Sequence, residues 1–128
     1  MADFSTLLAV KDLMKPEIVT ASVSVTVAES ARIMTEKQIS SIVLTDGEGK
    51  IAGLITETEI VRNVVAAGKD AGKTAAGDVM NDSVHMIAGD ASIFDARHMM
   101  ANLGVKHMVV ESGGKPIGLV SATALLGS

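Results

Sequence analysis

The sequence consists of two copies of one unit, and this internal repeat constrains the fold more strongly than any other feature. Shifting the chain by 66 residues places Asp12 on Asp78 and matches a first copy within residues 8–68 to a second copy within residues 75–127. One residue is lost in a later turn, so the offset is 65 from there on. The clearest matches join residues 12–14 to 78–80, 42–44 to 108–110 and 53–56 to 118–121. Any fold of this chain must therefore contain the same set of elements twice.

The first long helix of each copy has a start signal and an apolar stripe. Thr26 is followed three residues later by Glu29, which is typical of a capping box at a helix N-terminus. Ser92 and Asp95 occupy the same places in the second copy. The apolar residues at helical spacing, which we expect to be buried, are Val27, Ala31 and Met34 in one copy and Ile93, Ala96, Met100 and Leu103 in the other.

Short strands and a closing helix complete each copy. Extended segments are predicted at residues 18–20 and 84–87, before the long helices. Two apolar runs joined by a glycine-containing turn, residues 41–44 and 51–55, predict a hairpin, and 108–110 and 117–120 repeat it. The closing helix of the first copy is expected to bury Ile60, Val61, Val64 and Val65 and to end near Gly68, and that of the second copy is residues 123–126.

These elements predict an α/β fold made of two small modules, residues 8–68 and 75–127. A lone unit of about 60 residues is only marginally stable, because it buries too little of its surface. We therefore expect the two modules to pack sheet against sheet around a pseudo-twofold axis, so that each covers what the other leaves exposed.

Composition excludes several classes of function. The chain has no cysteine, which removes disulfides, thiolate catalysis and cysteine-based zinc sites, and its three histidines lack metal-ligand spacing. With two aromatic residues and a net charge of −4, nucleic acid is a poor candidate partner. No apolar stretch is long enough for a membrane span, and the start of the chain lacks the features of a signal peptide. We expect a cytoplasmic binding protein without a catalytic constellation.

The order of motifs resembles the cystathionine-β-synthase (CBS) domain family. The residues that carry the resemblance are 12–16 (Asp-Leu-Met-Lys-Pro), the helix from Val27 to Met34, 39–44 (Ile-Ser-Ser-Ile-Val-Leu) and 53–56 (Gly-Leu-Ile-Thr), with their counterparts in the second copy. The resemblance implies paired modules, a disc-like homodimer of two pairs, and clefts between modules that bind AMP, ADP, ATP or S-adenosylmethionine. Some members of the family bind no ligand.

The family's ribose motif is Gly, two residues, Thr or Ser, two residues, Asp. The first copy keeps the hydroxyl at Thr56 and has Glu59 in place of the Asp, whereas the second copy has Ser121 followed by Ala124. A carboxylate accepts hydrogen bonds from vicinal hydroxyls, so the first copy is the better candidate for a ribose site. The alternative is that Thr56 and Glu59 only cap the following helix.

The resemblance also implies an adenine pocket and a phosphate contact. The adenine pocket would be lined by Ile18, Val19, Thr20 and Ile39, for which core packing is the alternative. Basic residues ahead of the second strand face phosphate in the family. Lys106 and His107 stand there in the second copy and Ser40 and Ser41 in the first, and the alternative is that they are solvated strand ends.

The leading hypothesis is a stand-alone sensor that binds an adenine nucleotide and signals to an unknown effector protein, with no obligatory cofactor. The alternatives are a ligand-free dimerisation module, favoured by the changes at Glu59 and Ala124, and an S-adenosylmethionine binder, which would need no phosphate contact.

Overall fold

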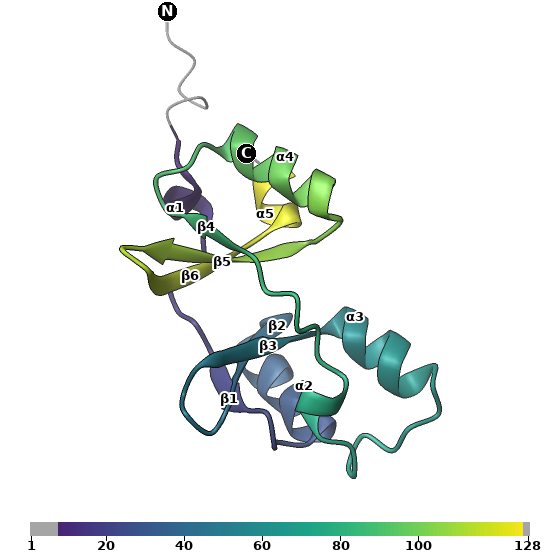
Figure 1. Ribbon diagram of the computed structural model, residues 1–128. Coiled ribbons are helices and arrows are strands. Elements are labelled where there is room, and N and C mark those ends of the chain that lie inside the picture. The colour runs from purple at the N-terminus through teal and green to yellow at the C-terminus, as the bar shows by residue number, and fades with distance from the viewer. Residues whose placement is uncertain (1–7, 127–128) are drawn as a thin grey trace, which may run out of the picture. The chain divides into compact units, whose positions relative to one another are not determined.

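A computed structural model describes residues 8–126, which form two compact units, each with a three-stranded sheet and helices (Figure 1). One unit comprises residues 19–84, and the described part of the other comprises residues 8–18 and 85–126. The predicted α/β fold with a twice-repeated order of elements is confirmed.

The unit of residues 19–84 contains a mixed sheet in the order β1-β2-β3. Strand β1 runs parallel to β2, and β2 forms an antiparallel hairpin with β3. The elements in chain order are β1 (Thr20–Ser22), α2 (Val27–Lys37), β2 (Ser41–Thr45), β3 (Ile51–Thr56), α3 (Glu57–Glu59), the π-helix η2 (Ile60–Val65) and the 3₁₀ turn η3 (Ala76–Asp78).

The other unit repeats this arrangement with the sheet order β4-β5-β6. Again the first two strands are parallel and the last two antiparallel. Its elements are α1 (Val10–Leu13), β4 (Met86–Ala88), α4 (Ile93–Leu103), β5 (His107–Ser112), β6 (Lys115–Ser121) and α5 (Ala122–Leu126).

Local sequence explains where the two long helices begin and end. The Thr26 hydroxyl accepts a hydrogen bond from the Glu29 backbone N–H at 3.1 Å, and Ser92 does the same for Asp95 at 3.0 Å. Helix α2 ends at Gln38, whose φ of 55° is left-handed, and α4 ends at Gly104, which tolerates its φ of 68° at no steric cost. The hydroxyl half of each predicted capping box is therefore present.

Each sheet presents one face to its helices, and a hydrophobic core fills the space between them. The core of residues 19–84 joins α2 and η2 to the sheet through Val27, Met34, Ile42, Ile55 and Val64. The core of the other unit includes Ile93, Ala96, Met100, Met108 and Leu125. The stripes predicted for the long helices are confirmed at Val27, Met34, Ile93, Ala96 and Met100.

Three apolar residues that were expected in the core are exposed instead. In η2, Val61 is 58% and Val65 69% exposed, whereas Val64 is buried and Ile60 packs against the core. A short helix on a small sheet buries one stripe, and Ile60 and Val64, four residues apart, take it. Leu103 lies in the last turn of α4, beyond Met100, and is also exposed.

The leading segment of each sequence copy packs on the sheet of the other copy. Lys15 pairs with Leu119 of β6 through hydrogen bonds of 2.8 and 3.1 Å, and Asn81 pairs with Leu54 of β3 at 2.8 and 2.9 Å. The compact units thus differ from the sequence copies, residues 8–68 and 75–127: segment 8–18 lies with the second copy's sheet and segment 75–84 with the first copy's.

Two glycines allow these segments to approach. A Cβ on Gly53 would lie 2.5 Å from Met80 Sδ and 2.8 Å from the carbonyl oxygen of Asn81. A Cβ on Gly118 would lie 2.5 Å from the carbonyl oxygen of Lys15. Because real Cβ contacts are longer, only glycine fits at either position without a shift of the backbone.

Candidate functional site

Most of the predicted site residues of the first copy meet at one end of the sheet β1-β2-β3. Ser41 is the register partner of Thr56, and the carbonyl oxygen of Ser40 accepts a hydrogen bond from Glu57 N at 3.3 Å. The carbonyl oxygen of Val19 accepts from Val43 N at 3.0 Å, which anchors the segment that leads into β1. Parallel pairing of β1 with β2 thus places Val19 at the same sheet end as Ser41 and Thr56.

Thr56 and Glu59 form the most strongly connected polar pair at this sheet end. The backbone N–H and the hydroxyl of Thr56 both donate to Oε1 of Glu59, at 2.7 and 2.6 Å. The same hydroxyl oxygen accepts from Thr58 N at 3.2 Å. Thr56 is 7% exposed, whereas Glu59 is half-buried. This is the capping box of α3, so the capping interpretation of the two residues describes their geometry in this structure.

The capping role leaves acceptor capacity on the carboxylate. Oε2 of Glu59 forms no hydrogen bond with any residue that the structure describes. A carboxylate has about four lone-pair positions on its two oxygens, so it can hold the Thr56 cap and accept further hydroxyl protons. Capping and ribose binding are therefore chemically compatible at this residue.

The residues predicted for the adenine pocket lie in different environments. Val19 and Ile39 pack against the core of residues 19–84, and core packing is the alternative given for them above. Thr20 is exposed at the start of β1. Ile18 is half-buried and is the last residue of the other compact unit before the chain passes to Val19.

The equivalent sheet end of the other unit has a different charge. His107 is the register partner of Ser121, and the carbonyl oxygen of Lys106 accepts from Ala122 N at 2.8 Å. The Ser121 hydroxyl accepts from Ala124 N at 3.2 Å, so it caps α5 without a carboxylate partner. Lys106 is exposed and His107 is half-buried. This end carries Lys106 and His107 where the first copy has Ser40 and Ser41, and Ala124 where the first copy has Glu59.

Sequence reasoning did not assign a role to His85, which takes the position of Val19 in the second copy. Its carbonyl oxygen accepts from Val109 N at 3.0 Å, the counterpart of the bond between Val19 and Val43. The offset of 66 residues between the copies was the signal that identifies it. His85, from the segment before β4, therefore lies at the sheet end that bears Lys106 and His107.

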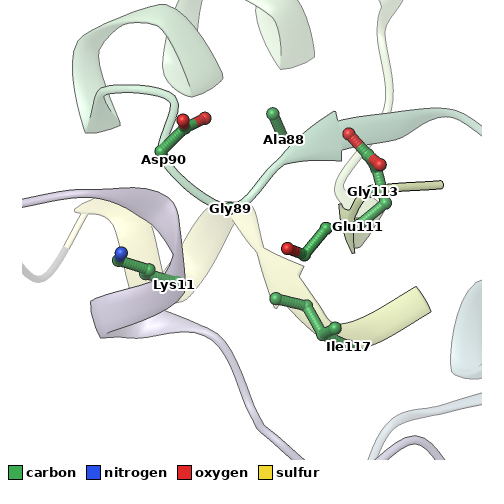
Figure 2. A pocket seen from close by; sticks show the side chains of 8 residues that line it. Lys11, Ala88, Gly89, Asp90, Glu111, Gly113 and Ile117 are labelled. Atoms are coloured by element: carbon green, nitrogen blue, oxygen red, sulfur yellow. The ribbon is translucent and has the colours of Figure 1, made fainter. Parts of the chain in front are cut away.

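A cavity of about 350 Å³ also lies in the unit of residues 8–18 and 85–126, near Glu111 and Ser112 (Figure 2). Strand β5 runs from His107 to Ser112, so this cavity is at the opposite end of the strand from the predicted phosphate contacts. None of the predicted site residues lines it.

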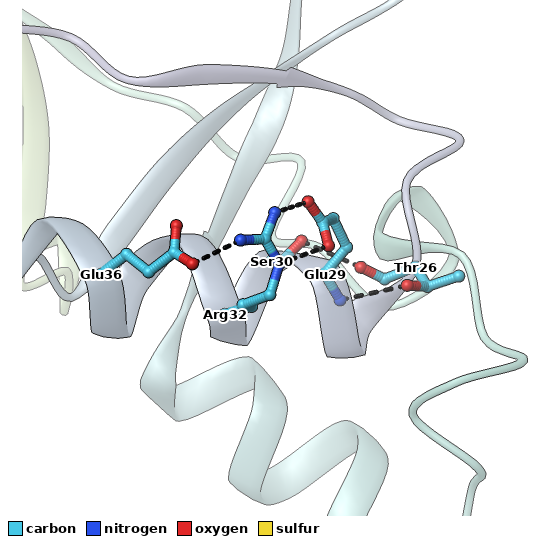
Figure 3. A network of polar contacts seen from close by, with 5 residues as sticks. All are labelled: Thr26, Glu29, Ser30, Arg32 and Glu36. Carbon is cyan, nitrogen blue, oxygen red and sulfur yellow. Dashed lines mark hydrogen bonds and ion pairs between the residues drawn. The ribbon is translucent and has the colours of Figure 1, made fainter.

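An ion-pair network on α2, away from the candidate site, shifts the pKa values of two of its members. Arg32 donates to both Glu29 and Glu36, and the second ion pair measures 2.5 Å (Figure 3). The hydrogen bond from Arg32 holds the pKa of the Glu29 carboxyl below its ordinary value, and both carboxylates raise the pKa of Arg32. Glu29 therefore pairs with Arg32 and does not complete the capping box at Thr26.

Residues 8–126 lack two further features, a cluster of metal ligands and a membrane-spanning helix. That part of the chain contains no group of three or more His, Cys, Asp or Glu side chains placed to hold a metal ion. Nor does any helix in it have the length and apolar character needed to cross a membrane.

Comparison with known proteins identifies the family. The CBS domain profile matches residues 10–66 and 76–128. An uncharacterized protein of Methanopyrus kandleri is 29% identical over 119 residues, which cover 92% of this chain and 61% of that protein. A 17.7 kDa uncharacterized protein of Acidianus ambivalens is 33% identical over 99 residues, covering 77% of this chain and 58% of its own length. The chain thus spans about three fifths of these relatives.

Solved structures agree with this assignment. A crystal structure from Burkholderia ambifaria, described as "a putative signal-transduction protein with CBS domains", has a TM-score of 0.84 at 27% identity and covers 92% of this chain and 90% of that one. An uncharacterized conserved protein from Pyrococcus horikoshii has a TM-score of 0.86 at 23% identity, with 95% and 92% coverage, and shares the fold. The chain belongs to the CBS domain family, and no catalytic family is indicated.

Proposed function

We propose that the protein is a regulatory CBS-pair protein that binds an adenine nucleotide, with Glu59 receiving the ribose hydroxyls. The observation that carries the proposal is the Thr56–Glu59 pair at the sheet end, with Oε2 of Glu59 unused by the described residues. The family match adds support, because it places Thr56 within a matched module. The similarity to a protein described as acting in signal transduction favours a regulatory role.

Lys106 and His107 are the proposed phosphate contacts. His107 is the first residue of β5 and Lys106 precedes it. Position 124, which matches Glu59, is an alanine, so it places no carboxylate near these two residues. The Lys106 ammonium can donate charge-assisted hydrogen bonds to phosphate oxygens, which are stronger than bonds between neutral groups, and a ring N–H of His107 can also donate. Whether AMP, ADP or ATP binds is then decided by how many phosphates these donors hold.

The experiment is a thermal-shift series with AMP, ADP, ATP and S-adenosylmethionine on the wild type, Glu59→Gln and Lys106→Gln. A ligand at 100 times its Kd adds about 2.7 kcal/mol to the free energy of unfolding. That raises Tm by several degrees, at about 2–8 °C per kcal/mol. We expect the shift with one adenine nucleotide to shrink in both variants and to remain in Lys115→Gln, an exposed control on β6.

The outcomes separate the candidate ligands. Sensitivity at Glu59 combined with indifference at Lys106 would favour S-adenosylmethionine, which has no phosphate. Equal shifts in wild type and both variants would show that the site has been assigned to the wrong residues.

A ligand-free dimerisation module is the second candidate, and two observations favour it. Glu59 already receives both donors of Thr56, which gives the residue a structural role without any ligand. In addition, Val61 and Leu126, which occupy equivalent positions in the two copies, are 58% and 75% exposed. Exposed apolar side chains mark association surfaces where they form a contiguous patch.

Sedimentation velocity with and without nucleotide distinguishes the two candidates. A homodimer whose sedimentation and stability are unchanged by all four ligands would support the ligand-free module. A nucleotide-dependent change in either quantity would support the sensor.

A further inference from the structure

The cavity of about 350 Å³ in the unit of residues 8–18 and 85–126 is lined by side chains of mixed charge. Its wall includes Lys11 of α1, Asp90 after β4, Glu111 of β5 and Ile117 of β6. Figure 2 shows these four side chains arranged around Gly89. The predicted nucleotide contacts lie at the other end of β5, so this is a separate place in the fold.

Comparison of the two copies shows how the wall of the cavity differs from the same place in the other unit. Gly89 and Lys11 correspond to Val23 and Gly77 in the other unit, and the same backbone hydrogen bond, at 2.9 Å, joins each pair. A Cβ on Gly77 would lie 2.8 Å from Val23 Cβ, so the valine side chain fills the space beside Gly77. A Cβ on Gly89 would lie 3.2 Å from Ile117 Cδ1 and 3.4 Å from Lys11 Cβ, so these two side chains border the position that the Val23 side chain fills in the other unit.

The charges around the cavity are also specific to this unit. Lys11, Asp90 and Glu111 correspond to Gly77, Ser24 and Thr45, none of which is charged. The two copies therefore differ in two ways at this place. Glycine stands at position 89 where the other copy has Val23, and three charged residues stand where the other copy has uncharged ones. An ammonium and two carboxylates therefore border the cavity in this unit alone.

The charged groups that border the cavity do not form ion pairs with one another. Within residues 8–126, neither the Lys11 ammonium nor the Asp90 carboxylate has a hydrogen-bond or ion-pair partner. Glu111 accepts the Gly114 N–H at 2.7 Å through Oε2 only. Opposite charges that share a cavity without pairing match a ligand that carries both charges, and half-buried Ile117 offers an apolar wall for its remainder.

We propose that this cavity binds a free aliphatic α-amino acid. The ligand's carboxylate would pair with Lys11, its ammonium with Asp90 and Glu111, and its side chain would lie against Ile117. The site does not depend on the proposed nucleotide site, because the two share no residue.

The test is isothermal titration calorimetry of the nucleotide-free chain with L-leucine up to about 10 mM, a range that includes millimolar Kd values. Two probes each remove one charge: L-leucinamide lacks the carboxylate, and 4-methylpentanoate lacks the ammonium. We expect L-leucine to bind and each probe to bind at least about 10-fold more weakly.

Variants of the protein assign the binding to this cavity. Gly89→Val introduces the residue of the other copy at a position whose φ is not left-handed. Its Cβ would lie 3.2 Å from Ile117 Cδ1 and 3.4 Å from Lys11 Cβ, so we expect binding to be lost, and thermal denaturation checks that the variant folds. Lys11→Gln and Asp90→Asn, at exposed positions, should each weaken L-leucine binding about 10-fold or more. These two variants decide the matter if Gly89→Val does not fold. Lys115→Gln, an exposed lysine outside the cavity, is the matched control and should bind as the wild type does.

Two results would overturn the proposal. One is the absence of any heat of binding with L-leucine over this range. The other is binding that Lys11→Gln and Asp90→Asn leave unchanged, which would place the amino acid elsewhere on the chain.

Discussion

One oxygen of Glu59, Oε1, accepts both the backbone N–H and the hydroxyl proton of Thr56, at 2.7 and 2.6 Å. The pair therefore holds the start of α3 at the same sheet end where the nucleotide is proposed to bind. Glu59 therefore has a structural role, as the cap of α3, and a proposed binding role, as the acceptor of the ribose hydroxyls. A substitution that keeps the cap and removes the negative charge tests the two roles separately.

Glu59→Gln is such a change. A glutamine at this position of a capping box still accepts the Thr56 N–H, so we expect the free energy of unfolding to fall by less than about 0.5 kcal/mol. Glu59→Ala removes the cap and should cost about 0.5–2 kcal/mol. Urea denaturation of both variants measures the difference. Equal and large losses would show that the negative charge itself stabilises the fold.

Gly53→Ala and Gly118→Ala should destabilise the protein more than an ordinary glycine substitution does. At both positions the new Cβ meets a backbone oxygen, Asn81 O at 2.8 Å or Lys15 O at 2.5 Å, which cannot turn away as a side chain can. Forced overpacking of this kind costs about 1–3 kcal/mol.

Gly47→Ala provides the control for these two variants. A Cβ at Gly47 has no neighbour within 4 Å, and its φ is not in the left-handed region. We expect its midpoint of urea denaturation to equal or slightly exceed that of the wild type. A loss at Gly47 as large as at Gly118 would contradict the close-approach explanation.

The exposed aliphatic positions predict a change in association without a change in fold. Val61→Glu and Leu126→Glu place a charge on surfaces that are already exposed, so the stability of each unit should change by no more than about 0.5 kcal/mol. If these positions lie in the proposed homodimer interface, the weight-average mass in sedimentation equilibrium should fall toward that of one chain. Thr123→Glu, an exposed polar position on α5, is the comparison and should leave the mass unchanged.

The ion-pair network of α2 predicts a specific pH dependence. Arg32 lowers the pKa of Glu29 from its ordinary value of 4.5. A carboxyl whose pKa is lower in the folded state stabilises the fold above the unfolded-state pKa and loses that contribution as pH falls through the folded-state pKa. Titration of the Glu29 carboxyl by NMR should give a midpoint below 4.5 in the wild type.

Arg32→Gln should return the Glu29 midpoint to its ordinary value, whereas Arg62→Gln, on η2 and not paired with Glu29, should leave it low. Because the pair is solvent-exposed, the effect on overall stability should be small. An unchanged midpoint in Arg32→Gln would mean that another group lowers the pKa.

The order of elements could be predicted because each start and turn is encoded locally. Thr26 and Ser92 cap their helices as expected, and the hairpins follow from apolar runs with glycine-containing turns. The exposure of Val61, Val65 and Leu103 could not be predicted, because periodicity identifies an apolar stripe but not how wide a stripe one small sheet can cover.

The candidate site was predictable to the same extent. Antiparallel register places Ser41 opposite Thr56 and His107 opposite Ser121, so the two predicted hairpins account for this part of the site. Spacing could not show whether Glu59 caps the helix at Thr56 or faces a ligand. The ribose motif and the capping box both place the acid three positions after the hydroxyl residue. The cavity beside Gly89 could not be predicted, because the residues that line it come from four separate segments of the chain that only the fold brings together.

The packing of residues 8–18 with the second copy and of residues 75–84 with the first has a consequence for the origin of the chain. A product of the gene before duplication, cut at the boundaries of one repeat, would have carried a leading segment and a sheet that do not pack on each other. In such a protein, the leading segment and the sheet would both find a packing partner only when two molecules exchange their leading segments. Duplication and fusion would then have turned a reciprocal exchange between two chains into a permanent one within a single chain, after which each half was free to acquire its own charges.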